Sequence, residues 1–272
     1  MNITKIFTES SPKIEIAAIE QNAAQPLLFI HAVTMGSYEF EQHFLPFFSK
    51  KGFAVYAMNW RGHGQSEGRE DFKSHGLMDY YTDLEHVVTF IKERTGKEPI
   101  LVGHSTGGVL TQIYLSKHPV SKVVFLGIGI GELSIQGLMG FLAGRFPEKL
   151  AAYSQSGNSD ILMKDRTLEY ELMFTDESRP DDYESIIDKM VAQSASDQLF
   201  FDYSTFKTPA ALGNPQVLAI TGDQDPVGTV ESVKALATFY NGTYHIVENH
   251  RHDLTLSKGW TEVTDKIYQF LQ

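Results

Sequence analysis

Residues 99–115 read PILVGHSTGGVLTQIYL, a stretch that predicts a strand, a tight turn and a helix in immediate succession. The apolar, β-branched run at 100–102 is typical of a buried strand. Residues 103–107 spell G-x-S-x-G, and the apolar residues after them recur at helical spacing. The sequence therefore places Ser105 on the turn between a buried strand and a buried helix.

A serine in this setting is typical of a nucleophile. The flanking glycines allow a turn too tight for side chains, so that the hydroxyl of Ser105 projects above the sheet edge. The helix behind it directs backbone N–H groups and the positive end of its dipole toward developing negative charge. Alternatively, Ser105 is an ordinary N-cap of a buried helix. The nucleophile hypothesis requires a base and an acid elsewhere in the chain.

Composition limits the class of protein. A length of 272 residues fits one core with an inserted subdomain. Contents of 42% hydrophobic and 21% charged residues are typical of a soluble globular protein. A net charge of -11 argues against nucleic acid or an anionic membrane surface as the main partner. The absence of cysteine excludes disulfides, thiolate metal sites and a cysteine nucleophile. We find neither a signal peptide nor an apolar run of membrane-spanning length, and expect a cytoplasmic protein without an integral membrane segment.

Eight runs have the character of β-strands. The first two alternate and predict an antiparallel hairpin, whereas most later runs are apolar throughout and are separated by helical patterns. This rhythm predicts a mostly parallel sheet with helices on both faces. The runs are 3–7, 13–19, 26–30, 53–58, 100–102, 122–126, 216–220 and 243–247. The helices expected between and after them are one that runs through Phe40 and Phe48 to about Gly52, then 77–94, 230–239 and 260–271.

The alternation stops between 131 and 212. That segment has no convincing strand, and its helical stretches include 133–142, 161–174 and 183–192. It is too long for a bare loop in a compact domain. We predict a helical cap at 131–212, inserted between two core segments, 1–130 and 213–272. Several apolar and methionine side chains of the cap are expected to line a pocket for the apolar arm of a substrate.

The required acid and base stand after two late strands. Because ligands of parallel sheets bind at the carboxyl ends of the strands, we searched there. Asp223 and Asp225 follow the run at 216–220, and His250 and His252 follow the run at 243–247. The order Ser, Asp, His is the one expected for a strand–turn–helix nucleophile.

Four stretches together resemble the α/β-hydrolase superfamily, and within it the lysophospholipase and monoacylglycerol-lipase-like group with a helical cap. Residues 30–33 resemble the family's His-Gly oxyanion loop, and residues 59–66 its D-x-R-G-x-G-x-S loop. Residues 103–108 match the serine turn, and Gly222-x-x-Asp225 with His252 fits the acid and base positions. The resemblance implies an eight-stranded, mostly parallel sheet with an inserted cap.

The resemblance also implies roles for single residues. Ser105 is the expected nucleophile, Asp225 the acid by its G-x-x-D spacing, and His252 the base. The expected oxyanion-hole donors are the backbone N–H groups of Val33 and Thr106.

Other residues near these motifs are an alternative base, two departures from the family pattern and residues with expected structural roles. His250 remains the alternative base; if His252 is the base, we expect His250 to be a surface loop histidine. Two residues depart from the family: Ala32 replaces a glycine, which raises the question of whether its loop keeps the family's backbone, and Asn59 replaces an aspartate. Arg61 is expected to anchor loops, and the glycine-rich stretch 127–131 to act as a hinge.

The sequence as a whole predicts a serine hydrolase that cleaves a hydrophobic carboxylic ester without a cofactor. No metal is expected, because residues 250–253 do not match the H-x-H-x-D-H run of metallohydrolases. One alternative is the same triad acting on a thioester, lactone, amide or carbon–carbon bond. A second is a ligand-binding module without catalysis.

Overall fold

The computed structural model describes residues 2–22, 24–193 and 195–272. Eight strands of these ranges form one sheet in the order β1-β2-β4-β3-β5-β6-β7-β8. Strands β1 and β2 pair antiparallel, as do β2 and β4, and the remaining pairs are parallel. This confirms the predicted sheet, including its opening hairpin. The strands are β1 (Thr4–Phe7), β2 (Glu15–Ile19), β3 (Pro26–Ile30), β4 (Ala54–Met58), β5 (Ile100–His104), β6 (Lys122–Leu126), β7 (Gln216–Gly222) and β8 (Thr243–Val247).

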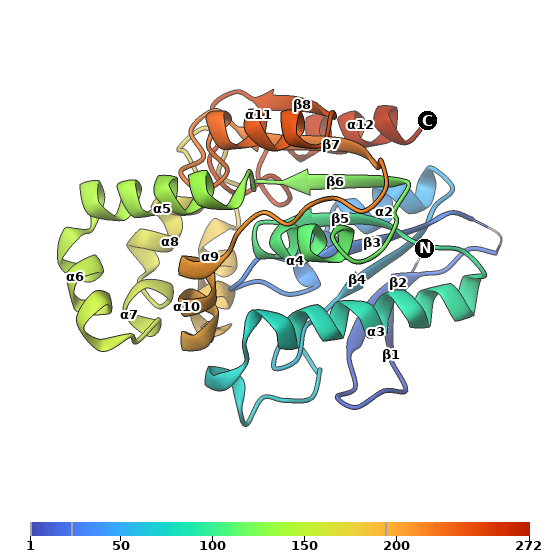
Figure 1. The fold of residues 1–272 in the computed structure, drawn as a ribbon, viewed down its shortest axis with the longest axis horizontal. Coiled ribbons are helices and arrows are strands. Elements are labelled where there is room, and N and C mark those ends of the chain that lie inside the picture. Colours follow the sequence, from blue (N-terminus) through green and yellow to red (C-terminus); the bar gives the residue numbers. More distant parts are fainter. Residues whose placement is uncertain (1, 23, 194) are drawn as a thin grey trace.

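Helices cover both faces of this sheet (Figure 1). Along β3, Leu28 and Ile30 enter the core on one face, while Leu27 and Phe29 enter the core on the other. This alternation explains why the strand is apolar throughout, because successive side chains point to opposite faces. The first face packs against α3 (Leu77–Thr95), α4 (Thr106–Leu115) and α11 (Val230–Phe239). The second packs against α1 (Tyr38–Glu41), α2 (Phe44–Lys50) and α12 (Trp260–Leu271).

The prediction of one continuous helix through Phe40 and Phe48 was wrong. Two helices, α1 and α2, are separated by a turn at 42–43. Pro46 supplies the reason, since inside a continuous helix its ring would collide with the carbonyl of residue 42. The break places Pro46 in the first turn of α2, where proline is tolerated.

Helices also fill the segment between β6 and β7, and no strand occurs among its described residues. The stretch predicted at 161–174 is divided in two: one helix ends at Met163, and Asp165 caps the next by accepting the N–H of Leu168. The helices are α5 (Gly131–Arg145), α6 (Pro147–Ser156), α7 (Asp160–Met163), α8 (Arg166–Met173), α9 (Tyr183–Gln193) and α10 (Asp197–Thr205). A short 3-10 helix, η1 (Phe72–Ser74), precedes α3.

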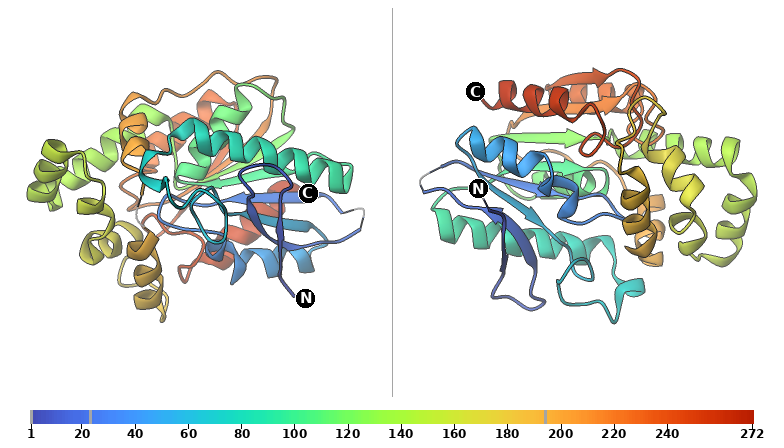
Figure 2. Two further views of the ribbon diagram at one scale, coloured as in Figure 1. Left: turned by 90° about the horizontal axis from the view of Figure 1, so that it is seen from below. Right: turned by 180° about the vertical axis from the view of Figure 1, so that it is seen from behind.

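These helices gather beyond one end of the sheet. All three views place them at the end toward which the β6 arrow points, which is the carboxyl end of the parallel strands (Figures 1 and 2). The carboxyl terminus lies at the opposite end. Among the described helices, none is both long and apolar enough to cross a membrane.

Two glycines allow α4 to start directly against the sheet. A Cβ added to Gly103 would lie 2.5 Å from the carbonyl oxygen of Gly107. A Cβ added to Gly107 would lie 2.1 Å from the carbonyl oxygen of Ile30 on the neighbouring strand β3. Both contacts are with backbone atoms, which cannot rotate away. The predicted tightness of this turn is therefore confirmed.

We predict that Gly107→Ala destabilises the protein by about 1–3 kcal/mol or more, because the added methyl group must displace backbone. The matched control is Gly140→Ala in α5, where an added Cβ would meet nothing within 4 Å. The free energy of unfolding of this control should increase by about 0.5–1 kcal/mol, because alanine has a better helix propensity than glycine. Denaturant unfolding measures both free energies. Equal effects of the two substitutions would contradict the close approach of α4 to β3.

Candidate active site

Ser105 occupies the turn between β5 and α4 in a strained backbone conformation. Its φ of 50° and ψ of -116° are unusual for a residue with a side chain. The flanking strand and helix maintain this geometry, since β5 pairs with both β3 and β6 and α4 is entirely buried. Strain of this kind costs about 1–3 kcal/mol and persists where the surroundings determine the conformation.

Two distant loops bring His252 and Asp225 to this turn. The Nε2 atom of His252 lies 2.8 Å from Oγ of Ser105. On its other side, Nδ1 of His252 lies 2.9 Å from Oδ2 of Asp225. Asp225 follows β7 and His252 follows β8, and both are almost fully buried. The backbone N–H groups of Val227 and Gly228 also donate to Asp225, at 2.7 and 3.0 Å, and fix the direction of its carboxylate.

The competing residues of these loops have other contacts. His250 donates from Nδ1 to the carbonyl of Glu248 at 2.7 Å and is only 8% exposed. The expectation of a surface histidine was therefore wrong, because Gly259 of the same loop packs directly against the His250 ring. Asp223 accepts the backbone N–H of His250 at 3.1 Å. It thus joins the two loops that carry Asp225 and His252.

Val33 and Thr106 are the residues expected to supply the oxyanion-hole donors. Both line the same cavity as Ser105 and His252. Within the described chain, neither backbone N–H has a hydrogen-bond acceptor, so both can receive a ligand oxygen. Ala32 is fully buried, and it is absent from the described residues with positive φ. Its methyl group is therefore accommodated without the backbone strain that would demand glycine.

A buried ion pair connects the loops around the site. His104 Nδ1 lies 2.5 Å from Oε1 of Glu39, and both side chains are inaccessible to solvent. The other oxygen of Glu39 accepts the N–H of Ala32 at 3.0 Å. The other nitrogen of His104 donates to the backbone carbonyl of His252 at 3.0 Å. The pair thus reaches both the loop that carries Val33 and the loop that carries the candidate base.

The electrostatics of this pair favour a charged imidazole. Burial alone lowers the pKa of His104, but the adjacent Glu39 carboxylate outweighs burial and raises that pKa from 6.5 to about 9. Asp253 and the carbonyl of His252 act in the same direction. At neutral pH, His104 therefore carries a proton on each ring nitrogen, which matches its two acceptors.

Gly127 passes close to the three candidate residues. Its φ is 57°, and an added Cβ would lie 3.1 Å from Nδ1 of His252 and 3.2 Å from Oδ2 of Asp225. This glycine therefore leaves room for the contact between imidazole and carboxylate. The sequence hypothesis of a hinge at 127–131 did not include this role.

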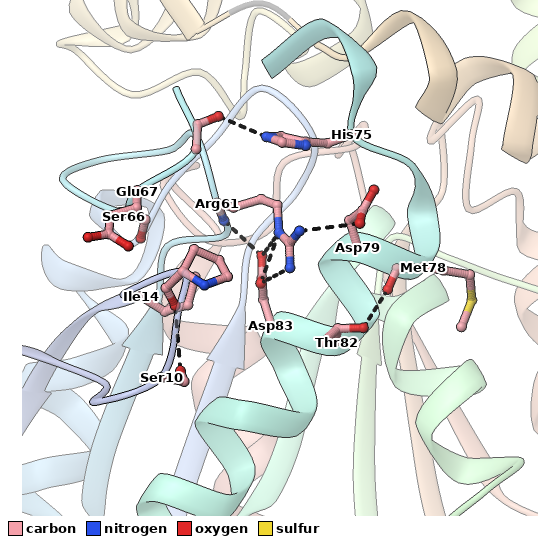
Figure 3. Close-up of polar contacts among 12 residues, drawn as sticks. Ser10, Ile14, Arg61, Ser66, Glu67, His75, Met78, Asp79, Thr82 and Asp83 are labelled. Carbon is pink, nitrogen blue, oxygen red and sulfur yellow. Dashed lines mark hydrogen bonds and ion pairs between the residues drawn. The ribbon is translucent and has the colours of Figure 1, made fainter. Parts of the chain in front are cut away.

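Arg61 and Asn59 both hold loops, which agrees with the anchoring role expected for Arg61. The guanidinium of Arg61 donates to Asp83 at 2.7 Å and to Asp79 at 3.2 Å, both on α3 (Figure 3). Asn59 accepts the N–H of Ser37 at 2.7 Å and donates to Glu15 at 2.8 Å. Neither Arg61 nor Asn59 is among the described residues that line the cavity beside Ser105.

That cavity has a volume of about 280 Å³ and an almost entirely apolar wall. Its size is at the lower end of the usual range for small-molecule sites, about 300–1,000 Å³. Core residues Ser105, Thr106 and His252 form one side of it. The apolar wall includes Leu138, Met139, Leu142, Leu162, Met163, Leu172 and Met173 from the segment between β6 and β7. The described residues contain no cluster of three or more histidine or acidic side chains that could hold a metal ion.

The sequence interpretation missed three polar residues at this site: Glu39, Glu169 and Tyr203. The hydroxyl of Tyr203 from α10 hydrogen-bonds the side chain of Thr106. Only Glu169 had a visible signal, because it shares the apolar stripe of its helix with Leu172 and Met173, three and four residues later. His104, the ion-pair partner of Glu39, lies 65 residues away in the chain, and Thr106, which contacts Tyr203, lies 97 residues away. Sequence spacing gives no sign of either contact.

Comparison with known families agrees with the observed fold. A family model described as the alpha/beta hydrolase fold matches residues 25–258. This match covers most of the chain, including the elements that carry Ser105, Asp225 and His252.

Two curated relatives and one solved structure illustrate the similarity. A non-heme haloperoxidase of Rhodococcus erythropolis is 30% identical over 44% of this chain and 43% of its own length. A bifunctional esterase/perhydrolase of Acinetobacter calcoaceticus is 32% identical over 38% of this chain and 36% of its own. The matches thus span less than half of either relative. A bacterial membrane phospholipase A has the same fold, with a TM-score of 0.75 and 18% identity over 99% of this chain and 86% of its own.

The buried Glu39–His104 pair predicts a pH-dependent stability. The pKa of His104 is raised on folding. The stabilisation of the folded state by the protonated imidazole is therefore complete below pH 6.5 and is lost as the pH rises through about 9. We expect the free energy of unfolding to fall by on the order of 3 kcal/mol over this range. Glu39→Gln should flatten that slope, since a neutral amide no longer favours the imidazolium.

Denaturant unfolding between pH 6 and 9.5 measures the effect. The control is Glu41→Gln in the same helix. It also removes a carboxylate, but that carboxylate contacts Lys5 and not a histidine. This control should keep the wild-type slope. The same slope in Glu39→Gln as in the wild type would contradict the assignment.

Proposed function

The chain belongs to the alpha/beta hydrolase fold family, and from this premise we propose that it is a serine hydrolase that cleaves a hydrophobic carboxylic ester. The observation that carries the proposal is the continuous hydrogen-bonded line from Ser105 through His252 to Asp225, at 2.8 and 2.9 Å. In a hydrolase fold, such a line beside an apolar cavity is the arrangement that acyl transfer requires.

In the proposed first step, Oγ of Ser105 attacks the ester carbonyl while Nε2 of His252 accepts the hydroxyl proton. The imidazolium formed in this way is stabilised by Asp225, which also holds the tautomer that leaves Nε2 free to accept. The C–O bond to the alcohol then breaks, and His252 returns the proton to the leaving oxygen. The acyl group remains as an ester on Ser105.

The second step repeats the first with water. His252 removes a proton from a water molecule that attacks the acyl carbonyl, and the proton then returns to Ser105 as the acid departs. In both steps, the N–H groups of Val33 and Thr106 are proposed to hold the negative oxygen. Loss of one such donor typically costs about 10²–10³ in turnover.

The cavity supports a substrate with an apolar arm, in the manner of a monoacylglycerol or lysophospholipid. We propose that helices α5–α10, which supply most of its wall, act as a cap over the carboxyl ends of the strands. The relative named as an esterase/perhydrolase is consistent with ester chemistry. The cytoplasmic location predicted from the sequence is part of this proposal.

The same triad could act on a thioester, lactone, amide or carbon–carbon bond, because fold alone does not select the bond. Rates on matched acyl-CoA, lactone and amide substrates would reveal such an activity. A non-catalytic binding module would differ in a more basic way: its serine would not be activated. A fluorophosphonate probe should label the wild-type protein at Ser105 if the serine is activated.

We predict that the wild type hydrolyses p-nitrophenyl esters of a chain-length series and that Ser105→Ala lowers kcat/KM by at least about 10³-fold. Ser154→Ala, on the exposed face of α6, serves as the control and should keep full activity. Hydrolysis that is equally slow with the wild type and Ser105→Ala across the series would end the hydrolase proposal.

Asp225→Asn tests the role of the acid. The substitution keeps the size of the side chain but favours the wrong imidazole tautomer, so we expect kcat to fall by about 10⁴-fold. The measurement is kcat on the best ester, with circular dichroism to establish that the variant is folded. Asp223→Asn is the matched control, since Asp223 bonds only loop backbone. Equal losses in the two variants would contradict the assignment of Asp225.

A further inference from the structure

Glu169 is a buried carboxyl group in the wall of the cavity, and none of the described residues pairs with it. The residue lies on α8, is 1% exposed and lines the same cavity as Ser105 and His252. Neither of its two oxygens has a hydrogen-bond partner among the described residues. Buried acidic side chains are almost always paired, so this one calls for an explanation.

A structural role does not account for Glu169. Leaving a buried polar group unpaired costs about 1–3 kcal/mol, and an ionised group costs more. Burial, assisted by the negative charge of Asp165, raises the pKa of the Glu169 carboxyl from 4.5 to about 8. At neutral pH, the group is therefore mostly the uncharged acid, which offers one O–H donor together with acceptor lone pairs.

The helix that carries Glu169 is fastened to the loop of the candidate base. The N–H of His252 donates to the carbonyl of Leu172 at 3.3 Å, and the N–H of Asp253 donates to the carbonyl of Met173 at 3.1 Å. Leu172 and Met173 follow Glu169 by three and four residues, on the same face of α8, and both line the cavity. Glu169 therefore occupies a fixed position in the substrate cavity, one helical turn from the attachment to the base loop.

The other residues that line the cavity limit which chemical groups of a ligand can bind beside Glu169. Glu169 is the only acidic residue among the described residues that line the cavity, and these include no lysine or arginine. An anionic arm would find no countercharge there. An ammonium group would have to lose its own hydration and also ionise the carboxyl, which is costly in an apolar setting. A hydroxyl group both accepts from and donates to an uncharged carboxyl, at a much smaller desolvation cost.

We propose that the substrate arm held in this cavity carries a hydroxyl group, and that the carboxyl of Glu169 binds it. The inference rests on the proposed ester hydrolysis and specifies its substrate: an uncharged, otherwise apolar, hydroxylated ester. Glu169 is then a specificity-determining residue that pairs only when the correct substrate enters.

The test compares matched esters, with p-nitrophenyl esters of ω-hydroxy acids set against n-alkanoic esters of equal heavy-atom count, from three to eight carbons. A second series places the hydroxyl on the alcohol arm, with monoacetates of diols set against alkyl acetates. At the best length, the wild type should prefer the hydroxylated ester in kcat/KM by at least about tenfold.

Three variants at the position and its neighbour complete the experiment. Glu169→Gln retains a donor and an acceptor and should keep most of the preference, whereas Glu169→Leu should abolish it. Glu171→Leu, two residues away and paired with Arg145 outside the cavity, should keep the wild-type ratio. The same ratio in Glu169→Leu and the wild type, or a preference for ω-ammonium esters, would overturn the proposal.

Thermal unfolding gives a second readout that does not depend on turnover. Because Glu169→Leu replaces an unpaired polar group with an apolar one, its Tm should rise by about 2–4 °C. A lower Tm would indicate a structural partner and count against the proposal. Ser105-dependent hydrolysis of the alkyl esters without a hydroxyl preference would defeat this inference alone. Absence of Ser105-dependent hydrolysis in both series would defeat the proposed function itself.

Discussion

The geometry of the site depends on the close approach of α4 to β3 across Gly107. Ile30 and Gly103 are paired neighbours in the sheet, and a Cβ at Gly107 would lie 2.1 Å from the Ile30 carbonyl oxygen. Without a side chain at this point, the helix begins beside the end of β3, where the loop with Val33 also begins. The same contact holds Ser105 in its strained turn and brings the amide groups of Val33 and Thr106 to one cavity.

The buried Glu39–His104 pair adds a second constraint that acts on three loops. Glu39 accepts the N–H of Ala32, while His104, which directly precedes Ser105, donates to the carbonyl of His252. Compared with well-packed apolar residues in the same place, a buried ion pair adds little net stability, because desolvation offsets its attraction. The main effect of this pair is to orient the site. Its hydrogen bonds fix the relative positions of the loops that carry the candidate nucleophile, base and oxyanion donors.

Two features of the cavity are unfavourable for the empty protein. Ser105 has a strained backbone, and the buried carboxyl of Glu169 has no hydrogen-bond partner in the part of the chain that the structure describes. Both face the same space, one from the core and one from the helices between β6 and β7. Backbone strain and unpaired buried polar groups destabilise the folded protein locally. Such features concentrate at functional sites, because a bound ligand can relieve or use them. The α8 helix joins the two sides through its hydrogen bonds to the loop of His252.

The sequence by itself determined the strands, most helices and the turn at Ser105, because apolar periodicity and glycine placement act locally. It also placed acidic and histidine candidates at the carboxyl ends of strands, since chain order in a parallel sheet dictates that edge. The residues alone left His250 and His252 as alternatives, and only the family resemblance favoured one. The tertiary structure decided which ring approaches Ser105. It alone paired Glu39 with His104 and buried Glu169 away from any partner among the described residues. These contacts depend on packing between segments far apart in the chain, and neither spacing nor composition encodes them.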